Sequence, residues 1–123
     1  MVIKIPLLAR PKKNSQQIYY NAKTNRPFIT QSQQYKDFEK ECGFYLFNYK
    51  TKINKPVNVK CLFYVKDKRK RDLINLEEAI ADILVKYDIL EDDNYNIIQS
   101  WDGSRIIYRA DKEPEIIIEI EDI

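Results

Sequence analysis

Residues 66–93 read KDKRKRDLINLEEAIADILVKYDILEDD, and this stretch passes from a basic run through an amphipathic segment to an acidic cluster. Asp72 follows the five cations and stands where a helix N-cap belongs, since a cap side chain accepts backbone N–H bonds and the helix dipole favours an anion there. The apolar residues that follow recur at helical spacing and predict a helix that ends near Tyr87. These residues are Leu73, Leu76, Ile80, Ile83, Leu84 and Tyr87.

The two charged ends of this stretch suggest a chemistry. Lysine and arginine side chains bind phosphate, and carboxylates such as Asp72, Asp92 and Asp93 can hold a divalent cation. A metal-dependent nuclease needs both kinds of group side by side. The alternative interpretation is a solvated basic face beside which Asp72 serves only as a helix cap.

The composition bounds the class of protein. The chain has 123 residues, of which 44% are hydrophobic and 33% charged, and is expected to form one soluble globular domain, residues 1–123. No apolar window could span a membrane and no secretory signal opens the chain, so Cys42 and Cys61 are expected to be reduced core residues of a cytoplasmic protein. There is no histidine, which excludes His-metal sites and Ser-His or Cys-His nucleophile pairs. Any catalysis would rest on carboxylates, lysine, tyrosine or a metal.

The net charge of +2 hides a strong asymmetry along the chain. Residues 1–71 hold 17 lysines and arginines against 4 acidic residues, whereas residues 72–123 hold 4 against 15. A basic half suggests a polyanionic partner, and an acidic half suggests a site for a hard cation or a device for solubility. Alternatively, the two halves only attract each other across the fold.

The N-terminal half predicts a strand, a hairpin and a helix. Residues 2–8 are β-like, and the proline among them favours a sheet edge or a strand end. Residues 18–20 and 27–30 predict a hairpin whose basic and aromatic side chains could meet DNA or pack on the sheet. Thr30 or Ser32 is a candidate N-cap for a helix with an apolar stripe. The stripe consists of Tyr35, Phe38, Cys42, Tyr45, Leu46 and Tyr49.

The C-terminal half predicts the rest of a sheet. Residues 57–65 alternate apolar and polar side chains, as in a strand with one buried face. Residues 96–101 and 105–109 are expected to pair as a hairpin through the Asp102-Gly103 turn, and residues 115–120 form a last strand. The fold class is therefore α/β (α+β), with a single mixed sheet and two helices packed on it.

Taken in order, these motifs resemble the RusA-type Holliday junction resolvases. Residues 71–76 (RDLINL), 82–84 (DIL) and 92–93 (DD) are similar to the family's basic residues followed by D-x-D-N-L-x-K, then D-x-L, then a D-D pair. The N-terminal strand, the basic loop and the paired tyrosine are similar too, as is the proline before a last strand. The resemblance covers nearly the whole chain and implies the RusA-like fold.

The resemblance implies a small homodimeric endonuclease that makes paired nicks in four-way DNA junctions during recombination and repair. It also implies Mg²⁺, or Mn²⁺ in its place, and no membrane partner; a prophage origin would fit. Carried over by position, Asp72 and Asp93 are catalytic metal ligands, and Asp92 is the other member of the D-D pair. The DNA-binding candidates are Lys12, Lys13, Lys68, Arg69, Lys70, Arg71 and Arg105.

Two positions depart from the family's pattern. Ile74 stands where the family has its second Asp, and Glu78 stands where it has lysine. Ile74 is expected at the edge of the apolar stripe, where it is a partly buried packing residue in one interpretation. In the other, it lies beside Glu78, which is one turn later on the same face of the helix. Glu78 could therefore reach back as a replacement metal ligand and catalytic residue. Three functions stay open: a Mg²⁺-dependent junction nuclease, a weakened relative that binds branched DNA without cleaving it, and a protein-interaction module.

Overall fold

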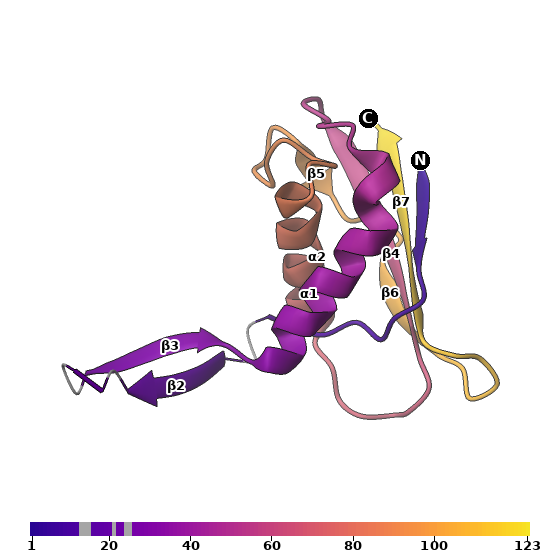
Figure 1. Ribbon diagram of the computed structural model, residues 1–123. Helices are drawn as coiled ribbons and strands as arrows, with labels where there is room; N and C mark the ends of the chain where they lie inside the picture. Colours follow the sequence, from indigo (N-terminus) through magenta and orange to yellow (C-terminus); the bar gives the residue numbers. More distant parts are fainter. Residues whose placement is uncertain (13–15, 21, 24–25) are drawn as a thin grey trace.

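A computed structural model describes residues 1–12, 16–20, 22–23 and 26–123 of the chain. In this described part, a mixed five-stranded sheet carries two α-helices, and a separate two-stranded sheet extends away from them (Figure 1). No helix in these ranges is long and apolar enough to cross a membrane. The predicted fold class, one mixed sheet with two helices, is confirmed.

The five-stranded sheet is organised around β4 (Val57–Val65), whose alternate side chains are buried as the sequence pattern predicts. β7 (Glu115–Asp122) pairs antiparallel with β4 along nearly its whole length, from Val57 opposite Asp122 to Tyr64 opposite Glu115. β1 (Val2–Ile5) pairs antiparallel with the other side of β7 and forms the sheet edge. Pro6 follows it directly, which suits a residue that cannot donate to a ladder.

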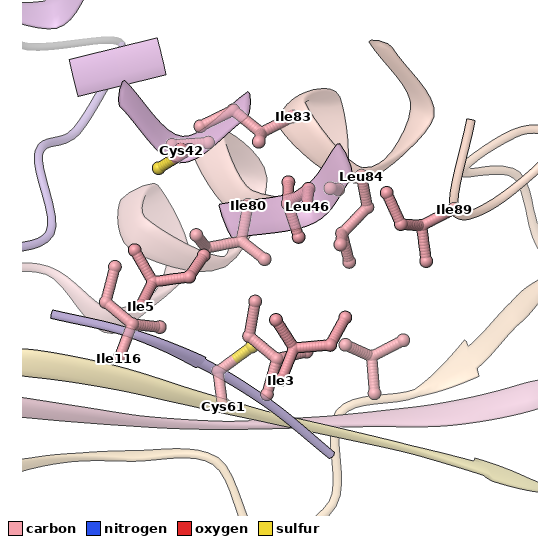
Figure 2. Packing of buried hydrophobic residues seen from close by; sticks show 14 of the residues in the cluster. Ile3, Ile5, Cys42, Leu46, Cys61, Ile80, Ile83, Leu84, Ile89 and Ile116 are labelled. Carbon is pink, nitrogen blue, oxygen red and sulfur yellow. The ribbon is translucent and has the colours of Figure 1, made fainter. Parts of the chain in front are cut away.

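Both helices lie on the same face of this sheet and share one core with it. α2 (Leu73–Lys86) follows β4, and α1 (Gln33–Leu46) ends in a short 3-10 turn, η2 (Phe47–Tyr49). Figure 2 shows side chains from α2, α1 and the sheet meeting in this core, Ile80, Leu46 and Cys61 among them. Cys42 and Cys61 are both free and buried. Their position agrees with the expectation of reduced core residues.

The first helix is capped by Ser32, one of the two predicted candidates. Its hydroxyl oxygen accepts a hydrogen bond from the Tyr35 backbone N–H at 3.1 Å, which satisfies one of the free donors of the first turn. The predicted stripe is mostly buried, but Tyr45 is 41% exposed and does not belong to the core. It lies at the edge of the stripe, where a helical face turns toward solvent.

The predicted hairpin is present as β2 (Gln16–Tyr20) and β3 (Pro27–Gln31). The strands pair antiparallel with Ile18 opposite Ile29, and they form a two-stranded sheet of their own. Figure 1 shows this hairpin reaching away from the helices and the main sheet.

The second predicted hairpin is wrong. β5 (Ile98–Ser100) and β6 (Arg105–Tyr108) do not pair with each other; both run parallel to β4, one after the other along the same edge. Asp102-Gly103 does form a turn, with Ser104 N donating to Trp101 O at 3.1 Å and Gly103 at φ +88°. The turn bends the chain out of the sheet and returns it in the same direction.

Side chains explain why this edge strand is interrupted and not folded back. The Asn58 amide accepts from Asp102 N at 2.8 Å and donates to Asp102 O at 3.1 Å, so it binds the turn to β4. The Ser104 hydroxyl accepts from Cys61 N at 2.9 Å and thereby takes the place of a backbone carbonyl in the ladder. These long-range bonds outweigh the local hairpin preference of Asp-Gly.

Candidate functional site

The basic loop that joins β4 to α2 is held in shape by Asp67. Its carboxylate accepts two hydrogen bonds from the Arg71 guanidinium, at 2.9 and 3.0 Å, and one from Arg69 N at 2.8 Å. The bond from Arg71, followed by the one from the Arg69 amide, lowers the pKa of Asp67 to about 2. A bidentate arginine–carboxylate pair fixes geometry as well as charge. The loop therefore presents its other cations from a fixed backbone.

These cations surround a hollow at the N-terminal end of α2. The hollow has a volume of about 320 Å³, and Arg10, Arg69, Lys70, Arg71 and Asp72 supply its charged lining. Its apolar wall comes from Leu8, Ala9, Pro11 and Leu76. The first-turn N–H groups of a helix and its positive dipole end also favour an anion in such a place. The hollow can therefore accept a phosphate group beside the Asp72 carboxylate.

The predicted DNA-binding cations have different surroundings. Arg69 and Lys70 are exposed, and neither side chain takes part in an ion pair within the described ranges. Arg71 is committed to Asp67, and Lys68 lies over the Tyr108 ring at 5.0 Å. Arg105 is exposed on β6, on the far side of β4 from β7.

The two lysines of the N-terminal loop complete this set of candidates. Lys12 pairs with Asp82, its Nζ lying 3.0 Å from Oδ2. Lys13 lies outside the described residues. The DNA-binding role of all these cations stays a prediction.

Asp72 occupies the N-cap position of α2 but does not cap it with its side chain. The carboxylate instead accepts one hydrogen bond from Asn75 Nδ2 at 3.2 Å and stays exposed to solvent. The interpretation of Asp72 as only a helix cap is therefore not supported, because a capping carboxylate would accept a backbone N–H. Asp72 lines the basic hollow, and its exposed carboxylate remains available to a ligand.

Ile74 and Glu78, where the resemblance implies departures from the family pattern, both lie on the outer surface of α2. Ile74 is 75% exposed, so the interpretation of a partly buried packing residue is wrong. The helix turns this position outward, and burial of Leu76 and Ile80 sets its rotation. Glu78 is exposed as well. Their exposure leaves both side chains free to act on a ligand at this surface.

The acidic pair lies in the loop after α2. Asp92 accepts hydrogen bonds from Asp93 N at 2.7 Å and from Asn94 Nδ2 at 3.2 Å, and it orders the loop in this way. Burial raises the pKa of Asp93 above its ordinary value, and so do its contact with Asp92 and the charge of Asp82. Asp93 therefore lies within electrostatic reach of Asp82 on α2.

The proposed carboxylates do not gather in one place. The described residues contain no group of three acidic or cysteine side chains arranged to hold a metal ion. Asp72 and Asp82 are ten residues apart on one helix, which corresponds to about 15 Å along its axis. Asp72 lines the basic hollow, and the charge of Asp82 acts on the Asp93 carboxyl. The donor chemistry suits a hard cation, but the described residues of one chain bring no three of the predicted ligands together.

Sequence reasoning missed two residues around these groups and gave a third, Asp82, no role beyond its place in the D-x-L motif. Arg10 reaches the hollow from the loop after β1, Asp67 holds the basic loop, and Asp82 pairs with Lys12. Arg10 also faces Gln34, whose amide oxygen, once oriented to satisfy its hydrogen bonds, accepts from both guanidinium nitrogens at 3.1 and 3.2 Å. An i, i+4 spacing of Asp67 and Arg71 was the one local signal. Arg10 and Asp82 are placed by contacts far apart in sequence.

Comparison with known proteins assigns a family. No curated protein sequence matches the chain at a significant level. The family model described as "Endodeoxyribonuclease RusA" matches residues 9–121, which is nearly the whole chain and includes the basic loop, α2 and the acidic pair. The chain therefore belongs to the RusA family of Holliday junction endodeoxyribonucleases.

Proposed function

We propose that this protein resolves four-way DNA junctions by paired nicks, as a homodimer and with Mg²⁺ or Mn²⁺ as cofactor. The observation that carries the proposal is Asp72, whose carboxylate is not used as a cap and which lines the same hollow as Arg10, Arg69 and Lys70. The core that both helices share with the sheet supports one domain over residues 1–123. The buried free cysteines agree with a cytoplasmic location.

In this proposal the loop cations position the DNA backbone. Arg69 and Lys70 are exposed and contact phosphate oxygens, whereas Arg71 and Asp67 keep the loop in the conformation that presents them. Arg10 contributes a third charge from a separate segment. Phosphate contacts position a protein without reading bases, so selection of a junction would follow from the shape of the dimeric basic surface.

A protein that binds branched DNA without cleaving it is the second candidate. It is favoured by the exposed Ile74 in place of a carboxylate and by the lack of any three-ligand group among the described residues. A site with fewer carboxylates holds Mg²⁺ less well, since charge offsets the reluctance of this ion to lose water. Both candidates predict salt-sensitive junction binding, but only the first predicts nicks.

A labelled four-way junction, incubated with and without Mg²⁺ or Mn²⁺, separates the two. We expect the wild type to nick the junction symmetrically and to leave a linear duplex of the same sequence intact. Asp72→Asn and Asp93→Asn should each abolish nicking while binding persists or tightens, because negative charge near phosphate is removed. Asp111→Asn, an exposed carboxylate in the β6–β7 loop, is the matched control. A wild type no more active than Asp72→Asn at any metal concentration would leave only the binding function.

A further inference from the structure

Two phenylalanine side chains stand in solvent at the C-terminal end of α1. Phe44 is 73% exposed, and Phe47, the first residue of η2, is 67% exposed. They are three residues apart and therefore lie on one face of the helical chain. This face is not the one that packs on the sheet. The buried residues of α1 are Tyr35, Phe38, Cys42 and Leu46. Exposed aromatic side chains that cluster in this way mark a surface for an interaction.

The two rings border a groove between α1 and the residue that follows α2. The groove has a volume of about 510 Å³ and is lined by Lys40, Gly43, Phe44, Phe47, Lys50 and Tyr87. The Tyr87 ring lies directly against the helix at Gly43, where a Cβ atom would come within 2.7 Å of the ring. The Tyr87 hydroxyl donates to the Glu39 carbonyl oxygen at 3.0 Å. The groove therefore has a fixed aromatic wall.

The charge around this groove has one sign. In the part of the chain that the structure describes, both charged residues that line it are lysines, Lys40 and Lys50. Both are exposed, and neither forms an ion pair within these ranges. Lys50 lies over the Phe47 ring at 5.1 Å. Glu39, on the same helix, is already paired with Lys86 and does not neutralise them. The groove thus joins apolar surface to uncompensated positive charge.

We propose that this groove binds an acidic peptide segment of a protein partner. An aromatic or aliphatic side chain of the peptide packs between the rings of Phe44, Phe47 and Tyr87. Flanking carboxylates of the peptide pair with Lys40 and Lys50. Buried apolar anchors supply most of the affinity of such a contact, and complementary charge selects the partner.

The charge argues against two other occupants. A second copy of this chain, bound by a two-fold contact, would place each pair of lysines against the same pair in its partner. Like charges brought together in this way repel each other. Duplex DNA would match the lysines, but it presents phosphates on its outside and no anchor side chain for the apolar recess. An acidic peptide satisfies both the lysines and the aromatic rings.

The groove is remote from the basic hollow. Asp72 precedes α2 and Tyr87 follows it, so the helix separates them by about 22 Å along its axis. The groove also lies at the end of α1 that is far from the β2–β3 hairpin (Figure 1). A peptide bound there leaves the hollow open to DNA. The inference therefore goes beyond the proposed function and does not depend on it.

Peptide selection tests the inference. A phage library of random short peptides is selected on the immobilised protein, after phage that bind the variant Phe44→Ser/Phe47→Ser have been removed. We expect the recovered peptides to carry acidic residues on either side of an aromatic or aliphatic residue. The peptide recovered most often is then synthesised with a fluorescent label, and anisotropy gives its dissociation constant for each variant.

Phe44→Ser should weaken binding of this peptide by about tenfold or more, because an aromatic anchor is lost. Lys40→Gln/Lys50→Gln should weaken it by about fivefold, with a larger effect at low salt. Two matched controls should leave it unchanged. Tyr45→Ser removes an exposed ring of α1 outside the groove, and Lys55→Gln removes an exposed lysine that pairs with Asp122. All these positions are exposed, so the fold should persist, and Phe44→Ser should bind four-way junctions as the wild type does.

Three results would overturn the inference. One is the recovery of basic or uncharged peptides only, or of no peptide whose binding depends on Phe44. Another is binding of oligothymidylate that Phe44→Ser weakens as much as it weakens the peptide, which would assign the groove to single-stranded DNA. The last is a dimeric wild type that Phe44→Ser/Phe47→Ser converts to a monomer in sedimentation velocity, which would assign the groove to a second copy of the chain.

Discussion

The basic loop before α2 leads to a quantitative prediction about salt. Three of the five cations in residues 66–71 already have partners, as Lys66 pairs with Glu113 and the other two engage Tyr108 or Asp67. Arg69 and Lys70 remain as exposed charges that can meet phosphate. The double variant Arg69→Ala/Lys70→Ala therefore removes two phosphate contacts without breaking an ion pair of the loop.

The expected magnitude follows from counterion release. Each phosphate contact on duplex DNA contributes about 0.9 to the slope of log affinity against log salt, so the double variant should lower the slope by about 1.8. Between 50 and 200 mM KCl, a fourfold change in salt, the wild type should lose about 12-fold more affinity than the variant loses.

Fluorescence anisotropy of a labelled four-way junction, measured in EDTA across this salt range, gives both slopes. Lys66→Ala is the matched control, because its ammonium is already paired with Glu113 and its removal should change the slope less. An unchanged slope in the double variant would refute the reasoning. A decrease in the slope for Lys66→Ala as large as the decrease for the double variant would refute it too.

Three further outcomes are expected. Ile74→Asp should change the free energy of unfolding by less than about 0.5 kcal/mol, because Ile74 is exposed, and should raise nicking at low Mg²⁺ in a metal titration; a stability loss of several kcal/mol would contradict this. Ile80→Ala should lower the free energy of unfolding, measured with urea, by about 2–5 kcal/mol, because the side chain is buried between α2 and the sheet. A decrease of less than about 1 kcal/mol would show that the surrounding residues close the space and leave no cavity. The pKa of Asp67 is lowered from 3.8 to about 2. The stability that its ionised carboxylate gives to the loop is therefore complete above about pH 4 and is lost as the pH falls through about 2. Junction binding should therefore show no transition due to Asp67 between pH 5 and 8, and a transition there that Asp67→Asn removes would count against the Arg71 pair.

Local pattern determined most of the elements. The alternation in β4, the apolar stripes of α1 and α2, and the Ser32 cap are short-range features, and the burial of their side chains follows from the period of each element. The family motifs in residues 71–93 are likewise a property of sequence order. The fold class and the family could therefore be predicted before any contact was known.

Local sequence pattern could not show that residues 96–109 do not form a hairpin. Asp102-Gly103 favours a turn, and the turn is present, but the partner of each flanking strand is decided by β4. The Asn58 amide and the Ser104 hydroxyl bind the chain to β4 on either side of the turn. Strand pairing depends on residues more than forty positions away, so the turn signal alone cannot set it.

The sequence by itself determined which charged residues this protein has and on which elements they lie; the tertiary structure decided which of them act together. Lys12 and Asp82 are seventy positions apart, and only the path of the N-terminal loop along α2 joins them. Asp72 stands at the start of α2 and Asp82 near its end, so the rise of the helix keeps the two carboxylates about 15 Å apart. Electrostatic interactions depend on distance in space, and distance in space between remote residues is a property of the folded chain.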